Sequence, residues 1–165
     1  MRKLREPVPI ERADEHLDKV SDVATLILKG YLLVEEALFA AVQTKFPHPQ
    51  YFLDANLRFA QLHSIAKGLF FTEEYALVWD AIQALNSVRN RLAHMLEPSV
   101  GAEELKKISF LMPVPNGALL DHPEAGNLIS ASLGAILTYL WLVPSGTNAE
   151  ANSKSSGPPS AGADY

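Results

Sequence analysis

The sequence predicts an all-α protein, and three observations lead to this prediction. Apolar residues recur at alternating steps of three and four along most of the chain, the spacing that keeps one side of a helix against a core. No stretch alternates apolar and polar residues with the period of two typical of a β-strand. Prolines separate the periodic stretches and mark where helices stop. With 165 residues, 48% of them hydrophobic and 20% charged, we expect one domain with a substantial core.

The longest periodic stretch lies between Pro9 and Pro47 and predicts one long helix. It carries two apolar stripes, as expected for a helix packed between neighbours or into a dimer seam. Gly30 near the middle lowers helix stability but permits the close approach of another helix. The two stripes are Leu17, Val20, Ala24, Ile27, Tyr31, Val34, Leu38 and Val42, and Val23, Leu26, Leu33, Ala37 and Ala40.

Two more helices are expected in the middle of the chain. Asp54 is a plausible N-cap for a second helix that ends near Leu69, because a short carboxylate side chain can accept from the first free backbone amides. Thr72 is expected to cap a third helix that runs to about Met95.

After Pro98 the sequence predicts a short helix over 102–111, an irregular connection over 112–123 and a last helix over 124–143. The last stretch has no charged residue between 126 and 143 and approaches the minimum length of a membrane span. We nevertheless expect a buried bundle helix, because small and polar residues dilute it and no cationic flank follows. These diluting residues are Asn127, Ser130, Ser132, Gly134 and Thr138.

From Pro144 onward the composition changes to Pro, Gly, Ser, Ala and Asn, with almost no bulky apolar residue. Such a segment cannot offset its ordering entropy by burial, so it predicts a disordered tail. The expected organisation is a helical domain over 1–143 and a tail over 144–165.

The composition also excludes several classes of protein. The chain has no cysteine, so a disulfide framework, a thiol nucleophile and a thiolate metal site are excluded. Three metal-type ligands lie close together at Asp121, His122 and Glu124, but a proline separates them and no second cluster exists, so we expect neither a metal nor a cofactor. No apolar segment follows the charged start, which predicts a cytoplasmic protein. The net charge of −5 requires that any nucleic-acid contact be local.

The third helix carries the most informative residues. With Leu85 at zero on a helical wheel, Arg89 lies at about 40°, and Asn86, Asn90 and His94 lie at about 100°, 140° and 180°. Seven apolar residues lie within about 80° of Leu85 and define a buried arc that includes Arg89. A guanidinium in such an arc cannot lose its charge and must find a carboxylate, carbonyl groups or a bound anion. The seven residues are Val78, Ala81, Ile82, Val88, Leu92, Met95 and Leu96.

Arg89 and His94 lie about 140° apart on one ideal helix and would not converge on one atom. A second copy of the same helix, crossing the first, would bring both residue types together in a shared cleft. This geometry predicts a symmetric homodimer whose seam uses the first and third helices.

The segment Arg89-Asn90-x-x-x-His94 resembles the R-x4-6-H motif of the HEPN superfamily, which implies a HEPN-like bundle of four to five helices over about residues 11 to 142. Many HEPN proteins are metal-independent endoribonucleases in which two protomers form a composite site. The resemblance implies that His94 transfers protons, Arg89 holds the scissile phosphate and Asn90 orients one of them. The RNA would supply its own nucleophile, the 2′-hydroxyl.

Other residues have expected roles around this motif. Arg91 and Lys67 are candidates for RNA backbone contacts, and Glu35 is the expected ion-pair partner of Arg89 because it lies at the edge of the buried face of its helix. His63 shares a helical row with aromatic residues and is expected in a partly buried position. Trp79 lies at about 120° on the third helix, where it could stack on a base or, as favoured here, seal a dimer interface.

A second hypothesis belongs to a different class. Arg89 could be neutralised by a buried carboxylate and His94 could simply stabilise the C-terminal end of its helix. The chain would then be a non-catalytic helical dimer, an interaction or regulatory module such as a nucleotidyltransferase partner or a phage-defence component. The ribonuclease hypothesis instead implies RNA, and an antitoxin in a toxin–antitoxin pair, as partners.

Overall fold

The structure, a computed structural model, describes residues 9–17, 20, 22–94, 102–111 and 125–153. This part of the chain contains seven α-helices, one 3₁₀ turn and no strand, so the all-α prediction is confirmed and the expected count of four to five helices is too low. The elements are α1 (Ile10–Leu17), α2 (Val23–Gln43), α3 (Pro49–Asp54), α4 (Phe59–Phe70), η1 (Glu73–Tyr75), α5 (Ala76–His94), α6 (Ala102–Ile108) and α7 (Ala125–Ser153).

The expected long first helix is two helices, α1 and α2. The Asp22 carboxylate accepts from the Thr25 backbone nitrogen at 2.8 Å and from the Thr25 hydroxyl at 2.6 Å, which starts α2 afresh. The Val20 amide donates to the Leu17 carbonyl at 3.2 Å, at the end of α1. The prediction was wrong because the apolar spacing continues across the break, whereas the Asp-x-x-Thr capping pattern marks it.

The expected second helix starts later than predicted, and a short helix that was not expected, α3, precedes it. Asp54 is the last residue of α3 and does not cap the following helix. Asn56 has a φ of 53°, a left-handed conformation that interrupts a right-handed helix. Arg58 is the N-cap of α4, and its backbone nitrogen donates to Gln61 Oε1 at 2.9 Å.

The third expected helix corresponds to η1 and α5. Thr72 lies at its start, but its side chain makes no capping hydrogen bond, and a 3₁₀ turn precedes α5. The short helix expected over 102–111 is α6, which ends at Ile108. The irregular connection expected over 112–123 lies outside the described residues.

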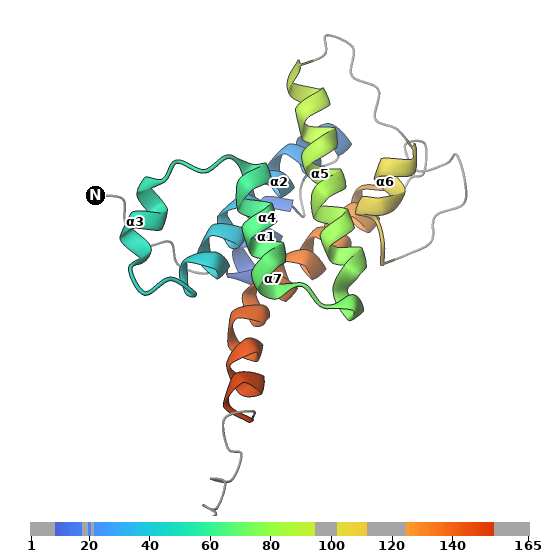
Figure 1. The fold of residues 1–165 in the computed structure, drawn as a ribbon. Coiled ribbons are helices and arrows are strands. Elements are labelled where there is room, and N and C mark those ends of the chain that lie inside the picture. The colour runs from blue at the N-terminus through green and yellow to red at the C-terminus, as the bar shows by residue number, and fades with distance from the viewer. Residues whose placement is uncertain (1–8, 18–19, 21, 95–101, 112–124, 154–165) are drawn as a thin grey trace, which may run out of the picture.

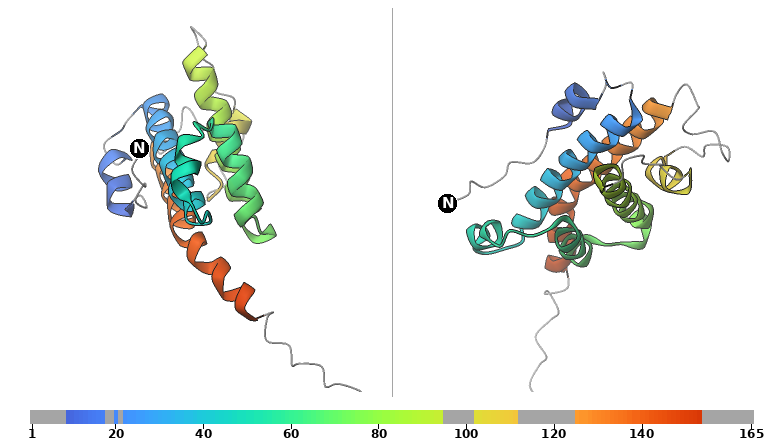
Figure 2. Two further views of the ribbon diagram at one scale, coloured as in Figure 1. Left: turned by 60° about the vertical axis from the view of Figure 1, so that its left-hand side comes forward. Right: turned by 90° about the horizontal axis from the view of Figure 1, so that it is seen from above.

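Helix α2 lies at the centre of the bundle. It runs side by side with α7, while α4 and α5 pack against it and against each other, as the view from above shows (Figure 2). Helix α6 packs on α5, and α1 packs on α2 and α7. A Cβ atom built on Gly30 would lie 2.5 Å from Leu133 Cδ1, so the expectation that Gly30 permits close helix approach is confirmed.

Helix α7 is longer than expected and continues through Pro144 to Ser153, projecting beyond the bundle (Figure 1). The predicted tail is therefore helical over 144–153, and its remainder lies outside the described residues.

By length and composition alone, Ala125–Pro144 could cross a membrane. Trp141 and Leu142 near the end of this stretch are 50% and 52% exposed, but α7 packs against α2 and buries six large side chains, as a core helix does. These buried residues are Ile129, Leu133, Ile136, Leu137, Tyr139 and Leu140.

Candidate functional site on helix α5

The buried side of α5 is the one that the helical wheel predicts. Leu92, two residues before the helix ends, is half-buried, and Met95 and Leu96 lie outside the described residues. The fully or almost fully buried residues of the predicted arc are Val78, Ala81, Ile82, Leu85 and Val88. This packing fixes the direction in which the polar residues of α5 point.

Arg89 is half-buried at the boundary between this packed side and the surface. Its guanidinium carbon lies 4.9 Å from the centroid of the Tyr31 ring, and its Nη1 donates to Asn90 Oδ1 at 3.1 Å. The expected ion pair with Glu35 is not formed: the ion pairs within the described part of the chain are Arg12–Glu36 and Arg91–Glu104. A cation–π contact thus takes the place of the expected carboxylate.

Tyr31 connects Arg89 with Glu35. Burial raises the pKa of the Tyr31 phenol, the negative charge of Glu35 and a hydrogen bond with it raise the pKa further, and the positive charge of Arg89 opposes both effects. Glu35 therefore acts on the hydroxyl end of Tyr31 while Arg89 lies over its ring. The two charged residues share Tyr31 as a neighbour, and the guanidinium keeps its own positive charge uncompensated by a direct carboxylate partner among the described residues.

Asn90 and His94 are both exposed on α5. His94 is the last residue of the helix, where a positive charge is favoured by the free carbonyl groups of the final turn. The structure thus brings Arg89 and Asn90 into direct contact and places His94 about one turn beyond Asn90, open to solvent.

The two expected RNA-contacting cations lie in different surroundings. Arg91 forms an ion pair with Glu104 of α6, whose other carboxylate oxygen accepts from the Ser87 hydroxyl at 3.1 Å, so Arg91 helps to join α5 to α6. Lys67 lies on α4, with its amine 5.1 Å from the centroid of the Phe71 ring. Within the described part of the chain no carboxylate forms an ion pair with Lys67.

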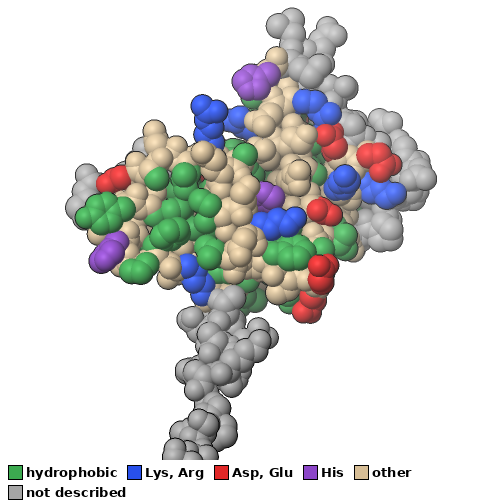
Figure 3. Space-filling model, in the orientation of Figure 1, with side chains coloured by type: hydrophobic (Ala, Val, Ile, Leu, Met, Phe, Trp, Pro, Cys, Tyr) green, Lys and Arg blue, Asp and Glu red, His purple; other side chains and the backbone are tan. Residues whose placement is uncertain are grey.

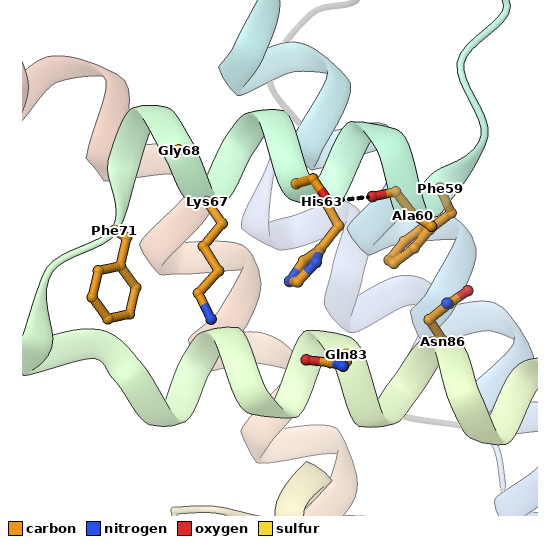
Figure 4. Close-up of a pocket in the computed structure, with 9 residues that line it drawn as sticks. Phe59, Ala60, His63, Lys67, Gly68, Phe71, Gln83 and Asn86 are labelled. Carbon is orange, nitrogen blue, oxygen red and sulfur yellow. Dashed lines mark hydrogen bonds between the residues drawn. The ribbon is translucent and has the colours of Figure 1, made fainter.

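Lys67 belongs to a groove between α4 and α5 that the sequence analysis missed. The groove has a volume of about 770 Å³, and Figure 4 shows its side chains pointing between the two helices. In the space-filling view, a histidine, a basic side chain and hydrophobic surface lie close together in the middle of this face (Figure 3). The lining residues are Phe59, Ala60, His63, Ser64, Lys67, Gly68, Phe71, Gln83 and Asn86.

Two sequence signals could have indicated the groove. Small residues recur every four positions along α4, at Ala60, Ser64 and Gly68, and all three are exposed. Asn86 begins the polar row on α5 that continues to Asn90 and His94. The small residues indicate a side of α4 without large side chains, and the polar row indicates a side of α5 that carries an amide. A groove results where these two sides face each other.

His63 lies in the middle of this groove, half-buried as the sequence predicts. Its ring lies parallel to the Phe59 ring, with centroids 6.4 Å apart, and 5.7 Å from that of Trp79. Burial lowers the pKa of the imidazole, and the nearby charge of Lys67 lowers it further, against a backbone interaction with Trp79 that raises it. His63 is consequently uncharged at neutral pH.

Trp79 does not lie at a dimer surface, contrary to the favoured expectation. Its side chain is fully buried, with its ring 5.7 Å from that of His63 and 5.9 Å from that of Tyr139. The helical wheel placed it correctly beside the buried arc, but α4 and α7 cover that side of α5. Trp79 forms the packed floor beneath the groove.

Among the described residues, no three His, Asp or Glu side chains come together as a metal site would require, and the stretch with Asp121 and His122 lies outside those residues.

Comparison of the chain with protein-family models, curated proteins and solved structures finds no match. The site and the all-helical fold are therefore the basis for a functional proposal.

Proposed function

We propose that this chain is a metal-independent endoribonuclease of the HEPN type, with a HEPN-like bundle and a composite site formed by two copies. The observation that carries the proposal is the environment of Arg89. Its guanidinium is half-buried, is held between Tyr31 and Asn90, and has no ion-paired carboxylate among the described residues. A fixed, uncompensated guanidinium is a site for an anion, and its planar set of donors fits phosphate oxygens.

In the proposed reaction Arg89 binds the scissile phosphate of single-stranded RNA and stabilises the negative charge that develops there. His94 transfers protons, since an imidazole can both accept and donate a proton and the residue is exposed where a substrate can reach it. The RNA 2′-hydroxyl gives up its proton and attacks the adjacent phosphorus, while the 5′-oxygen takes up a proton and leaves. The products are a 2′,3′-cyclic phosphate and a 5′-hydroxyl. The side-chain oxygen of Asn90, Oδ1, accepts a hydrogen bond from Arg89 Nη1 and holds the guanidinium in position.

Exposed apolar residues near Arg89 support a dimer seam. Leu28 and Leu32 on α2 are 40% and 60% exposed, and on a helical wheel they lie about 60° and 100° from Tyr31, on the side that also carries Glu35. An apolar surface beside an incomplete polar site suits a second copy of the chain. The seam would use α2 and α5.

Light scattering tests the dimer. Leu32→Glu would place a charge in the seam and should yield a monomer at micromolar concentration. Leu77→Glu is the matched control, because Leu77 is 63% exposed near the start of α5, more than two turns from Asn86. A wild-type protein that is monomeric would exclude the composite site.

An RNA cleavage assay in the presence of a chelator tests the activity. We expect wild-type protein to cut single-stranded RNA and leave cyclic phosphate ends, and His94→Ala to lower the rate by about 10²- to 10⁴-fold. His48→Ala is the control, since His48 is also exposed but precedes α3. Arg89→Lys keeps the charge and removes the planar donors, so it should lower the rate without unfolding the chain.

The second candidate is the non-catalytic helical dimer. The contact of Arg89 with Tyr31 favours it, because a guanidinium that packs on an aromatic ring can stabilise the bundle without any ligand. Identical RNA band patterns for wild-type protein and His94→Ala would favour this candidate. Under the first proposal the protein is a cytoplasmic toxin or phage-defence ribonuclease with an antitoxin partner. Under the second it is a regulatory partner, for example of a nucleotidyltransferase.

A further inference from the structure

The groove between α4 and α5 is separate from the three residues of the proposed cleavage reaction. Figure 4 shows the order of its side chains: Phe71 and Lys67 lie toward one end, His63 and Gln83 in the middle, and Phe59 and Asn86 at the other end. Its volume of about 770 Å³ is within the range of roughly 300 to 1,000 Å³ that is usual for ligand pockets.

Several polar groups of the groove are left open by the fold, although the Ser64 hydroxyl donates to the Ala60 carbonyl. His63 Nε2 is buried and has no hydrogen-bond partner among the described residues, an arrangement that is uncommon unless something else satisfies the nitrogen. Gln83 and Asn86 bring two amides to the same space, each with donors and an acceptor. Such a set can recognise the edge of a planar, polar ring, and the partly exposed ring of Phe71 offers a surface for stacking.

The charge of the groove favours an anionic ligand. Lys67 is the one charged residue among the described residues that line it, and none of these is acidic. This local positive charge lies on a chain whose formal net charge is −5, so it does not reflect a generally basic surface. An aromatic face, two amides and one cation together are the groups that proteins use to bind a base and its phosphate in single-stranded nucleic acid.

The groove also leads toward the candidate site. Asn86 lines its end and lies about one turn before Asn90 and about 12 Å along the helix before His94. A strand that follows the polar row of α5 from His94 therefore enters the groove at Asn86. The two features form one continuous path along α5.

We propose that the α4–α5 groove is the base-binding subsite of the RNA strand, in which one base packs against His63 while Gln83 and Asn86 read its edge, Lys67 binds a neighbouring phosphate, and Phe71 at the far end of the groove stacks on the next base. This subsite rests on the proposed ribonuclease function and adds to it the position at which base preference is determined. The residues that cut then lie on α5, and the residues that select the base lie on both α4 and α5.

The test is a binding measurement with 2′-O-methyl tetranucleotides of each of the four bases, which have no free 2′-hydroxyl and cannot be cut by the proposed reaction. Fluorescence anisotropy over a range of salt concentrations gives both affinity and salt dependence. One fewer phosphate contact on a single strand changes the slope of log K against log salt by about 0.7. We expect this change for Lys67→Ala and not for Lys106→Ala, which removes an exposed cation from α6.

Two further variants, Phe71→Ala and Gln83→Ala, test the proposed contacts with the bases. Phe71→Ala should weaken binding by about tenfold, the effect of losing one stacking surface, whereas Tyr51→Ala removes a ring that is 73% exposed on α3 and should leave affinity unchanged. Gln83→Ala should alter the preference among the four tetranucleotides. Circular dichroism establishes that each variant is folded.

The outcomes separate this subsite from the proposed cleavage. Equal salt slopes for Lys67→Ala and Lys106→Ala, or no binding of any tetranucleotide, would overturn the subsite even if wild-type protein cuts RNA. Binding that depends on Lys67 and Phe71 and is unchanged in His94→Ala would support it, even if no RNA is cut. Binding of free mononucleotides but not of tetranucleotides would also overturn it, since the groove would then hold a small molecule and no strand.

Discussion

The α2–α7 contact and the α4–α5 contact use small residues in opposite ways. In the first, Gly30 faces Leu133, whose side chain fills the space that the missing Cβ leaves. In the second, the exposed small residues of α4 line a groove whose α5 wall carries Gln83 and Asn86, and the space stays open. In this bundle a small residue indicates close packing where the opposite helix supplies a large apolar side chain. Where the opposite helix carries amides instead, the small residues line a groove.

This difference separates a stabilising helix contact from the groove proposed to bind RNA. The α2–α7 contact buries apolar surface on both helices and therefore contributes strongly to the free energy of folding. The walls of the α4–α5 groove are partly exposed and polar, so changes there should have small effects on folding. The predictions below test that division, starting with the packed floor beneath the groove.

The largest effect is expected at Trp79, which is fully buried under the groove. Trp79→Ala should lower the free energy of unfolding by about 3 to 5 kcal/mol, because it removes a large buried ring and leaves a cavity. Trp141→Ala is the matched control: this ring is 50% exposed on α7 and its loss should cost only about 0.5 kcal/mol. Urea denaturation measures both. Equal losses would mean that α4 and α7 do not cover Trp79.

The next effect compares two glycines. Alanine in place of either Gly30 or Gly134 should gain about 1 kcal/mol of helix propensity. At Gly30 the added methyl group would meet the buried Leu133 side chain, and such overpacking costs about 1 to 3 kcal/mol; at Gly134 it would meet nothing within 4 Å. Gly30→Ala should therefore be about 1 to 3 kcal/mol less stable than Gly134→Ala in thermal or urea unfolding. Equal stability would show that Leu133 moves aside at little cost.

Much of the fold could be predicted from the sequence because burial on one helix side leaves a periodic signal. The buried side of α5 and the role of Gly30 follow from spacing alone. The break at Asp22 was missed because apolar residues continue across it, and a local capping bond decides where α2 starts. The second helix was expected to start at Asp54, but α3 ends there and α4 starts only after the left-handed Asn56.

The candidate site was predictable only in part. The positions of Arg89, Asn90 and His94 on α5 follow from their spacing, but the neighbour of Arg89 does not, since Tyr31 and Glu35 lie on the same side of α2 and either could meet a guanidinium. The groove exists because α4 packs beside the side of α5 that carries Trp79, Gln83 and Asn86. Helical periodicity predicts which side of a helix is buried, but not which other helix packs against it.

A third prediction concerns Glu35, which lies near Tyr31 and forms no ion pair with Arg89. Glu35→Gln should cost roughly 0.2 to 1 kcal/mol, the usual value of a partly exposed charge interaction. Glu36→Gln is the control, because it breaks the exposed 2.9 Å ion pair with Arg12 and should cost about as much. A loss of about 3 to 5 kcal/mol for Glu35→Gln alone would instead indicate a buried pair with Arg89.

The smallest expected effect is a dependence of stability on pH from His63 in the groove. Burial lowers the pKa of its imidazole below the ordinary value of about 6.5. Between the lowered pKa and about 6.5, the unfolded chain binds a proton at His63 that the folded chain does not, so stability should fall as the pH decreases through this window. Above about 6.5 both states are neutral at His63 and the effect should vanish.

Unfolding by urea at pH 7.5 and at pH 5.5 measures this loss for wild-type protein and for His63→Gln, which has no group that titrates in the window. The variant should lose less stability between the two pH values than wild-type protein does. His48→Gln is the control for replacing a histidine by glutamine, because His48 is exposed and does not line the groove. If a tetranucleotide binds in the groove and its phosphate attracts the proton, saturating ligand should reduce the difference between wild-type protein and His63→Gln. An identical pH dependence for wild-type protein and His63→Gln, with or without ligand, would show that His63 is as open to water as the outer walls of the groove.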